Sequence, residues 1–160
     1  MDDRHLLLLP DLERYLAVVV PDTTALDALA ERFGAATLPT AEWTHLAHLR
    51  VAAWHVHHLT PEEALKRMRS GIRRLNLVHG TANSSTRGYH ETITVAFLRL
   101  SAQFLAACPV VMPLEARVDK LLGSPLAQPD VLLQFYSRKL LMSARARKRW
   151  VEPDVAPLPT

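Results

Sequence analysis

The chain has 160 residues, of which 49% are hydrophobic, and a formal net charge of +3 at pH 7. This length suits one domain with its own core, and the apolar content excludes an intrinsically disordered chain. No apolar run is long enough to span a bilayer, and the single cysteine, Cys108, excludes an internal disulfide and a multi-cysteine zinc site. We therefore expect a cytoplasmic protein that forms one domain over residues 1–160.

Two elements are predicted before the first histidine-rich segment. Residues 5–20 fit a short helix that runs into an extended, valine-rich segment, and Pro21 ends it. Residues 23–33 carry apolar side chains at helical spacing, and Gly34 follows them as expected for a residue that closes a helix.

The next helix is predicted over residues 44–59, with Thr40 or Thr44 as its N-terminal cap. His45, His48 and His55 fall on one stripe of this helix, along the edge of its apolar face. The pattern therefore lines up three imidazoles where the helix meets the core.

A clear helix start follows directly. Thr60 precedes Pro61, and Glu63 completes a capping box. The helix behind these residues carries apolar side chains on one face and arginines on the other, and it ends at Gly80. The short connection to the preceding helix predicts an antiparallel pair.

A third main helix is predicted over residues 89–107, after a polar loop. It is apolar on almost all sides, with a polar edge of Thr92, Arg99 and Gln103, so we expect it to be the central buried helix. His90 shares a stripe with Thr94, and the stripes of His90 and Glu91 both face packed surface. The fold class is therefore all-α, a single-domain helical bundle.

The C-terminal part predicts shorter elements. Helices are expected over residues 114–122 and 130–142, and Ser143 is expected to cap a short basic turn that ends at Trp150. Residues 151–160 hold three prolines and are predicted to be a tail that packs on the body.

The histidines next to helix starts suggest a metal site. His45 and His48 are three apart and can reach one ion, and His90 lies at the start of another helix. The positive end of a helix dipole favours the neutral imidazole that binds metal. Three histidines would leave an open position, as in catalytic sites, and Glu91 is preferred as a general base or an outer ligand.

The leading hypothesis is therefore a small metal-dependent enzyme that acts on a small polar molecule. One divalent ion, zinc, iron, nickel or copper, would be held by the three histidines, and the reaction would be hydrolase, lyase or oxygenase chemistry. Metal-free acid–base catalysis is also open, with His90 or Glu91 as the base and Tyr89 as a donor. Trp43, next to the first histidine pair, and His55 and Thr94, on the same stripes, are expected to line the pocket.

The alternative is a non-catalytic helical protein that binds a ligand or a partner, whose histidines form a buried polar network. Basic residues cluster at 66–74 and 138–149, without the interleaved aromatic side chains of nucleic-acid sites. Nucleic acid and membrane are therefore not expected as partners, anionic ligands remain open at the second cluster, and a homodimer remains open.

Four stretches resemble a family of small, uncharacterised bacterial proteins. They are WTHLAHL at 43–49, GYHETIT at 88–94, FYS at 135–137 and ARKRWVEPD at 146–154. The resemblance implies that the histidines and Glu91 are family features, and it brings no assigned activity. It also implies that Tyr136 and the segment 150–154 belong to the same pocket.

Overall fold

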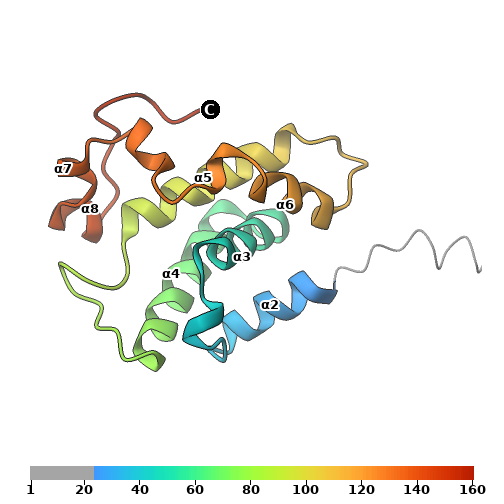
Figure 1. The fold of residues 1–160 in the computed structure, drawn as a ribbon, viewed down its shortest axis with the longest axis horizontal. Coiled ribbons are helices and arrows are strands. Elements are labelled where there is room, and N and C mark those ends of the chain that lie inside the picture. The colour runs from blue at the N-terminus through green and yellow to red at the C-terminus, as the bar shows by residue number, and fades with distance from the viewer. Residues whose placement is uncertain (1–23) are drawn as a thin grey trace, which may run out of the picture.

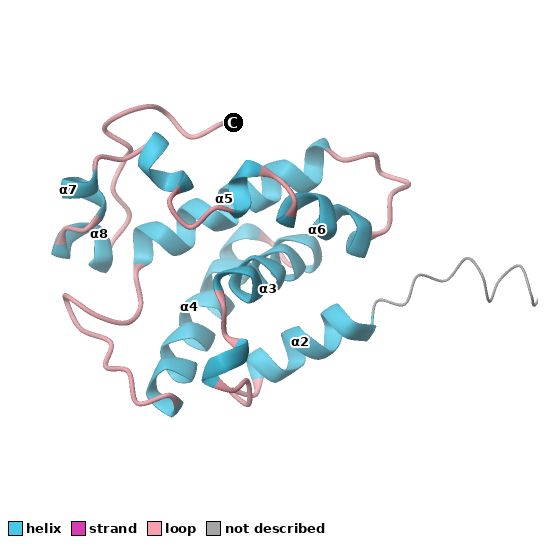
Figure 2. Ribbon diagram, viewed as in Figure 1, coloured by secondary structure: helices cyan, strands magenta, loops and turns pink. Residues whose placement is uncertain are grey.

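The computed structural model describes residues 24–160, and there the backbone forms seven α-helices and three short 3-10 helices without a strand (Figures 1 and 2). The α-helices are α2 Thr24–Gly34, α3 His45–His58, α4 Pro61–Val78, α5 Glu91–Ala107, α6 Leu114–Leu122, α7 Arg138–Leu141 and α8 Ala144–Lys148. The 3-10 helices are η1 Thr40–Glu42, η2 Pro125–Ala127 and η3 Val131–Gln134. The prediction for residues 5–20 lies outside the described residues.

The predicted helix starts are confirmed by their caps. The Thr44 hydroxyl accepts a hydrogen bond from the Ala47 N–H at 3.2 Å, which makes Thr44 and not Thr40 the cap of α3. The Thr60 hydroxyl accepts from the Glu63 N–H at 3.3 Å, and so caps α4. The second half of the predicted capping box is not formed, because the Glu63 carboxylate accepts from Arg67 Nε at 2.9 Å and makes no described bond to the Thr60 N–H. The Glu63 side chain thus stabilises the exposed first turns of α4 through Arg67.

Helix α5 is the central helix, as its apolar periphery predicts. It packs against α3, α4, α6 and α8, and it contributes side chains to all three apolar clusters of the described core (Figure 1). Leu98 joins the cluster shared with α3 and α4, Leu100 joins the C-terminal cluster, and Leu105 joins the cluster with α6. A helix surrounded in this way buries almost every face.

The contact between α2 and α4 depends on a glycine in the middle of α4. A Cβ atom on Gly71 would lie 2.3 Å from Cζ of Phe33, so the Phe33 ring occupies the space that any larger residue would need. Phe33 is 1% exposed and stacks on Trp43, with ring centroids 5.2 Å apart. The ring therefore has little freedom to withdraw.

We expect Gly71→Ala to lower the free energy of unfolding by about 1–3 kcal/mol because the added methyl group overpacks this contact. Helix propensity alone would predict the opposite, a gain of roughly 1 kcal/mol. Urea unfolding of the variant decides between the two. In a Phe33→Leu background, which removes the ring, the same substitution should become neutral or stabilising, and an equal effect in both backgrounds would contradict this account.

The predicted helix over residues 130–142 is wrong. The structure has η3, a break at residues 135–137, and the short helix α7. The Asp154 carboxylate, 17 residues further along the chain, accepts from the Ser137 N–H at 2.7 Å and from its hydroxyl at 2.6 Å. The Ser137 hydroxyl also caps α7, so these contacts stabilise a helix start where local periodicity predicts a helix interior.

The C-terminal segment lies across α5 and the 130–141 region. Tyr136 is fully buried, and its hydroxyl donates to the Val151 carbonyl at 3.0 Å. The Val155 N–H donates to the Phe135 carbonyl at 3.0 Å, so the segment is held by backbone contacts as well as by apolar burial.

Within the described residues, no helix combines the length and apolarity needed to cross a membrane.

Candidate functional site

The loop between α4 and α5 positions the Tyr89–Glu91 stretch. Gly88 has a φ of 80°, and a Cβ there would lie 2.4 Å from the Ala82 carbonyl oxygen, so the turn requires glycine. The Asn83 Oδ1 accepts from the Tyr89 N–H at 3.0 Å, and the Asn83 Nδ2 donates to the Arg73 carbonyl at 3.0 Å. Asn83 thus joins the loop both to α4 and to the start of α5.

His90 is the N-cap of α5 and not a residue of its first turn. Its backbone is extended, and its Nδ1 accepts from the Ile93 N–H at 3.3 Å. Its Nε2 donates to the Leu141 carbonyl at 2.8 Å. Burial lowers the pKa of His90, so the ring is neutral and both of its nitrogen atoms have protein partners. Neither nitrogen is free to bind a metal ion while these contacts hold.

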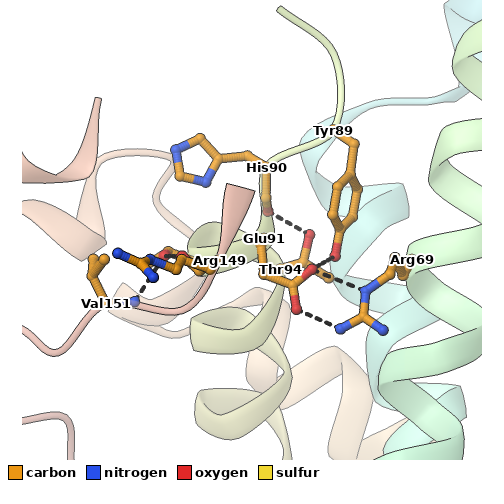
Figure 3. A network of polar contacts seen from close by, with 8 residues as sticks. Arg69, Tyr89, His90, Glu91, Thr94, Arg149 and Val151 are labelled. Carbon is orange, nitrogen blue, oxygen red and sulfur yellow. Dashed lines mark hydrogen bonds and ion pairs between the residues drawn. The ribbon is translucent and has the colours of Figure 1, made fainter. Parts of the chain in front are cut away.

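Glu91 lies at the centre of a polar network that Figure 3 shows. Its carboxylate accepts from Arg69 through two nitrogen atoms, with Nε to Oε2 at 3.0 Å, and from the Tyr89 hydroxyl at 2.7 Å. Burial by itself would raise the pKa of Glu91, but the hydrogen bonds from Arg69 and Tyr89 outweigh it and lower the pKa. Burial and the bond to Glu91 raise the pKa of Tyr89, so the phenol stays protonated. The network is a satisfied ion pair that α4 and α5 share.

The His90 ring points away from this network (Figure 3). It contacts the C-terminal region, whereas Glu91 and Tyr89 face α4. Adjacent residues at this helix start therefore stabilise two different contacts, and they do not converge on one ligand.

The polar edge predicted for α5 is wrong at Thr92, because this residue is fully buried. Its hydroxyl donates to the Arg149 carbonyl at 2.8 Å and accepts from the Val151 N–H at 3.2 Å. The C-terminal backbone covers this part of α5 and satisfies the hydroxyl there. No local pattern in the sequence indicates that contact, because the partners are 57 and 59 residues away.

His45 and His48 do share a cavity, of about 290 Å³, with Thr94 and Phe97 of α5. The His48 Nδ1 donates to the Thr44 carbonyl at 2.8 Å, which leaves a lone pair on its Nε2. Burial lowers the pKa of His48 to about 4 and also lowers the pKa of His45, so both rings are neutral at pH 7. The His45 Nε2 is buried and has no hydrogen-bond partner.

Three predicted pocket residues take different places. Trp43 packs on His48, with ring centroids 3.7 Å apart, so it lies beside the histidine pair. His55 is buried against Phe33 and donates from Nδ1 to the Val51 carbonyl, and it lines a separate cavity. Tyr136 is buried beneath the C-terminal segment and does not line the histidine cavity.

The described residues hold no group of three His, Cys, Asp or Glu side chains that could bind one metal ion. Of the three predicted ligands, His45 and His48 lie together, and His90 is engaged by backbone groups elsewhere. The three-histidine metal centre therefore stays a prediction, and the three side chains are not arranged around one ion position in this structure.

Arg69 is the residue that sequence reasoning misses. The sequence groups it with the solvated arginines of its helix, although a buried Glu91 needs a cationic partner. The need of a buried carboxylate for a cation indicates that some basic residue pairs with Glu91. The sequence does not show which one, because any of the five basic residues at 66–74 could face α5.

A comparison with known families finds no family model that matches this chain, and comparisons with curated proteins and with solved structures find no match either. The resemblance to a bacterial family of small helical proteins accordingly stays a prediction. A function for this chain therefore has to be inferred from its own cavities and contacts.

Proposed function

We propose that this is a non-catalytic helical protein that binds a small apolar molecule. The observation that carries the proposal is a pocket of about 940 Å³ between the end of α3, the start of α4, one face of α5 and the C-terminal segment. Pockets that bind small molecules have volumes of this size and mainly apolar walls with a few polar groups.

The walls of this pocket match an apolar ligand. Val56, Leu65 and Leu98 come from three different helices, and the C-terminal segment supplies Val155 and its prolines. The segment is anchored on both sides of the pocket, through the Ser137–Asp154 contacts and through a bond from Gln103 to the Thr160 carbonyl. A wall that is held in this way keeps the pocket open without a ligand, which reduces the cost of binding.

The polar groups at the rim are few and mostly engaged. Arg99 lies over the Trp150 ring, 4.2 Å from its centroid, and the Trp150 Nε1 donates to Glu152 at 2.7 Å. The Asp154 carboxylate is bound by Ser137. No lining residue resembles a nucleophile with an adjacent base, which supports binding over catalysis at this pocket.

The test uses a pair of matched substitutions on α5. Ala102 lines the pocket, whereas Ala106, one turn further along and also exposed, does not. We expect the parent to bind the neutral dye Nile red saturably, and we expect Ala102→Trp to weaken this binding roughly tenfold or more, about 1.4 kcal/mol, by filling the pocket. Ala106→Trp should bind as the parent does. Equal binding by all three proteins, or none by the parent, would contradict the proposal.

The metal-dependent enzyme is the competing proposal, and two observations favour keeping it. His45 and His48 line one cavity, and the buried His45 Nε2 has no hydrogen-bond partner. Elemental analysis of untagged protein separates the two. Near-stoichiometric zinc, iron, nickel or copper that is lost in His48→Ala would support the metal site and overturn a purely binding role. If His90→Ala lost the metal as well, the bonds of His90 to the Ile93 N–H and the Leu141 carbonyl would have to rearrange around the ion.

A further inference from the structure

A second cleft, of about 420 Å³, lies between α4, the loop before α5, and α8. We call it the basic cleft because three of its lining residues are cations, Arg73 from α4 and Arg147 and Lys148 from α8. Arg73 is far from Arg147 and Lys148 in the sequence, and the fold brings all three to one cleft beside the loop. Like charges gathered around one cavity repel one another, so a bound anion would stabilise them.

Two of the cations are held in place by neutral groups. The Arg147 Nη1 donates to the Gly88 carbonyl at 2.9 Å and to the Tyr89 carbonyl at 3.3 Å. The Arg73 guanidinium lies over the Tyr89 ring, 4.7 Å from its centroid. Carbonyls and an aromatic face orient the guanidinium groups but do not neutralise them. The charges are therefore positioned and still available to a ligand.

No carboxylate lines the basic cleft. Within residues 24–160, the ion pairs engage Arg32, Arg67 and Arg69, and none engages a cation of the cleft. The nearby Glu91 already binds Arg69 and Tyr89 with both of its oxygen atoms. Glu91 acts on Arg73 only through its more distant charge, so an anion from solution would meet cations that form no ion pair with a described acidic side chain.

The loop adds neutral donors to the same cleft. Ser84 and Ser85 line it beside Asn83. The Ser84 Oγ accepts from the Arg87 N–H at 3.1 Å and from the Thr86 N–H at 3.3 Å, so its position is fixed by the turn. The Ser84 hydroxyl keeps its own hydrogen, which either points to the Thr86 Oγ1 at 3.4 Å or donates to a ligand. Guanidinium groups with hydroxyl donors form the usual surroundings of a bound phosphate.

We propose that the basic cleft binds the phosphate group of a small phosphorylated molecule, a phosphate monoester. Arg73, Arg147 and Lys148 supply the charge, and the serine hydroxyls supply neutral donors. The volume of the cleft leaves room for a small organic group beyond the phosphate. The proposal is independent of the apolar pocket, which shares no lining residue with this cleft.

The test measures binding of inorganic phosphate and of phenyl phosphate by calorimetry at low and at moderate salt. Lys148→Gln and Arg73→Gln each remove one cation of the cleft. Arg145→Gln is the matched control, because it removes the same charge from an exposed residue of α8 that does not line the cleft. Lys148 is exposed and makes no described hydrogen bond, so Lys148→Gln is expected to fold as the parent does.

We expect the parent to bind phenyl phosphate in a one-to-one complex, and each cleft variant to weaken it roughly tenfold or more, as for the loss of a hydrogen bond to a charged group. Arg145→Gln should change it less than twofold, on the order of the effect of a distant surface charge. No binding by the parent would overturn the proposal. A second result would also overturn the proposal, in favour of a diffuse basic surface. In that result, Lys148→Gln and Arg145→Gln weaken phenyl phosphate binding equally, and the parent binds a short oligonucleotide more tightly than phenyl phosphate.

Discussion

Glu91→Gln is expected to lower the free energy of unfolding by about 2–3 kcal/mol. The substitution keeps the size of the side chain but removes the charge that Arg69 and Tyr89 bind, and removing one partner of a buried pair costs several kcal/mol. The Arg69 side chain is 37% exposed and can be hydrated in the variant, so we place the loss at the lower end. Urea unfolding at pH 7 measures it.

The chain offers a matched control for this substitution. Glu63 and Arg67 form an ion pair on the surface of α4, with side chains 38% and 57% exposed. Glu63→Gln should cost no more than about 0.5 kcal/mol, as for other exposed pairs on one helix. If Glu91→Gln were as harmless as Glu63→Gln, or stabilising, the network would not be structural, and the role of Glu91 as a general base would regain support.

The same network predicts a dependence on pH. Because the pKa of Glu91 in the folded protein lies below its ordinary value of 4.5, the pair stabilises the protein above that value. This contribution is lost as the pH falls through the lowered pKa. The difference in stability between the parent and Glu91→Gln should therefore narrow below pH 4.5, and a constant difference down to pH 3 would contradict the assignment.

His48 is expected to make the protein acid-labile at a higher pH than Glu91 does. Its pKa falls from 6.5 to about 4 on folding because the ring is buried, so the unfolded chain binds the proton more tightly. The stabilisation is complete above pH 6.5 and is lost as the pH falls toward 4. The expected loss at pH 5.0 relative to pH 7.5 is roughly 2 kcal/mol from this residue. His45, His55 and His90 act in the same direction.

The variant His48→Gln measures how much of the pH-dependent loss of stability comes from this residue. Urea unfolding at pH 7.5 and pH 5.0 should show a pH-dependent loss that is smaller in the variant by roughly 2 kcal/mol. Leu46→Gln, at an exposed position of the same helix, is the control and should show the loss of the parent, because neither side chain binds a proton in this pH range. If His48→Gln kept the full loss, the pKa of His48 would be the same in the folded and the unfolded chain, which would contradict a pKa lowered by burial of the ring.

Local signals in the sequence are sufficient to predict most of the helices. Thr44, Thr60 and Ser143 cap helices as their sequence contexts predict, since a cap bonds to an N–H only three residues away. The mostly apolar periphery of residues 91–107 identifies the central helix, because apolar side chains on several faces must be covered by other elements. An exposed edge remains at Arg99, Ala102 and Ala106. All-α architecture is expected from these signals, and the structure confirms it over residues 24–160.

The packing of the helices, in contrast, determines which of these elements meet at a site. The bond from the Ser137 N–H to Asp154 stabilises the start of α7 and so divides the predicted helix. The imidazole of His90, which the sequence predicts to bind metal, donates instead to the Leu141 carbonyl, 51 residues further along the chain. In the sequence, Arg69 is equivalent to the other arginines of its helix, and only the packing of α4 on α5 selects it as the partner of Glu91. A residue type and a local spacing show what a side chain is able to bind. Its actual partner depends on the position of groups far along the chain, which only the tertiary contacts bring within reach.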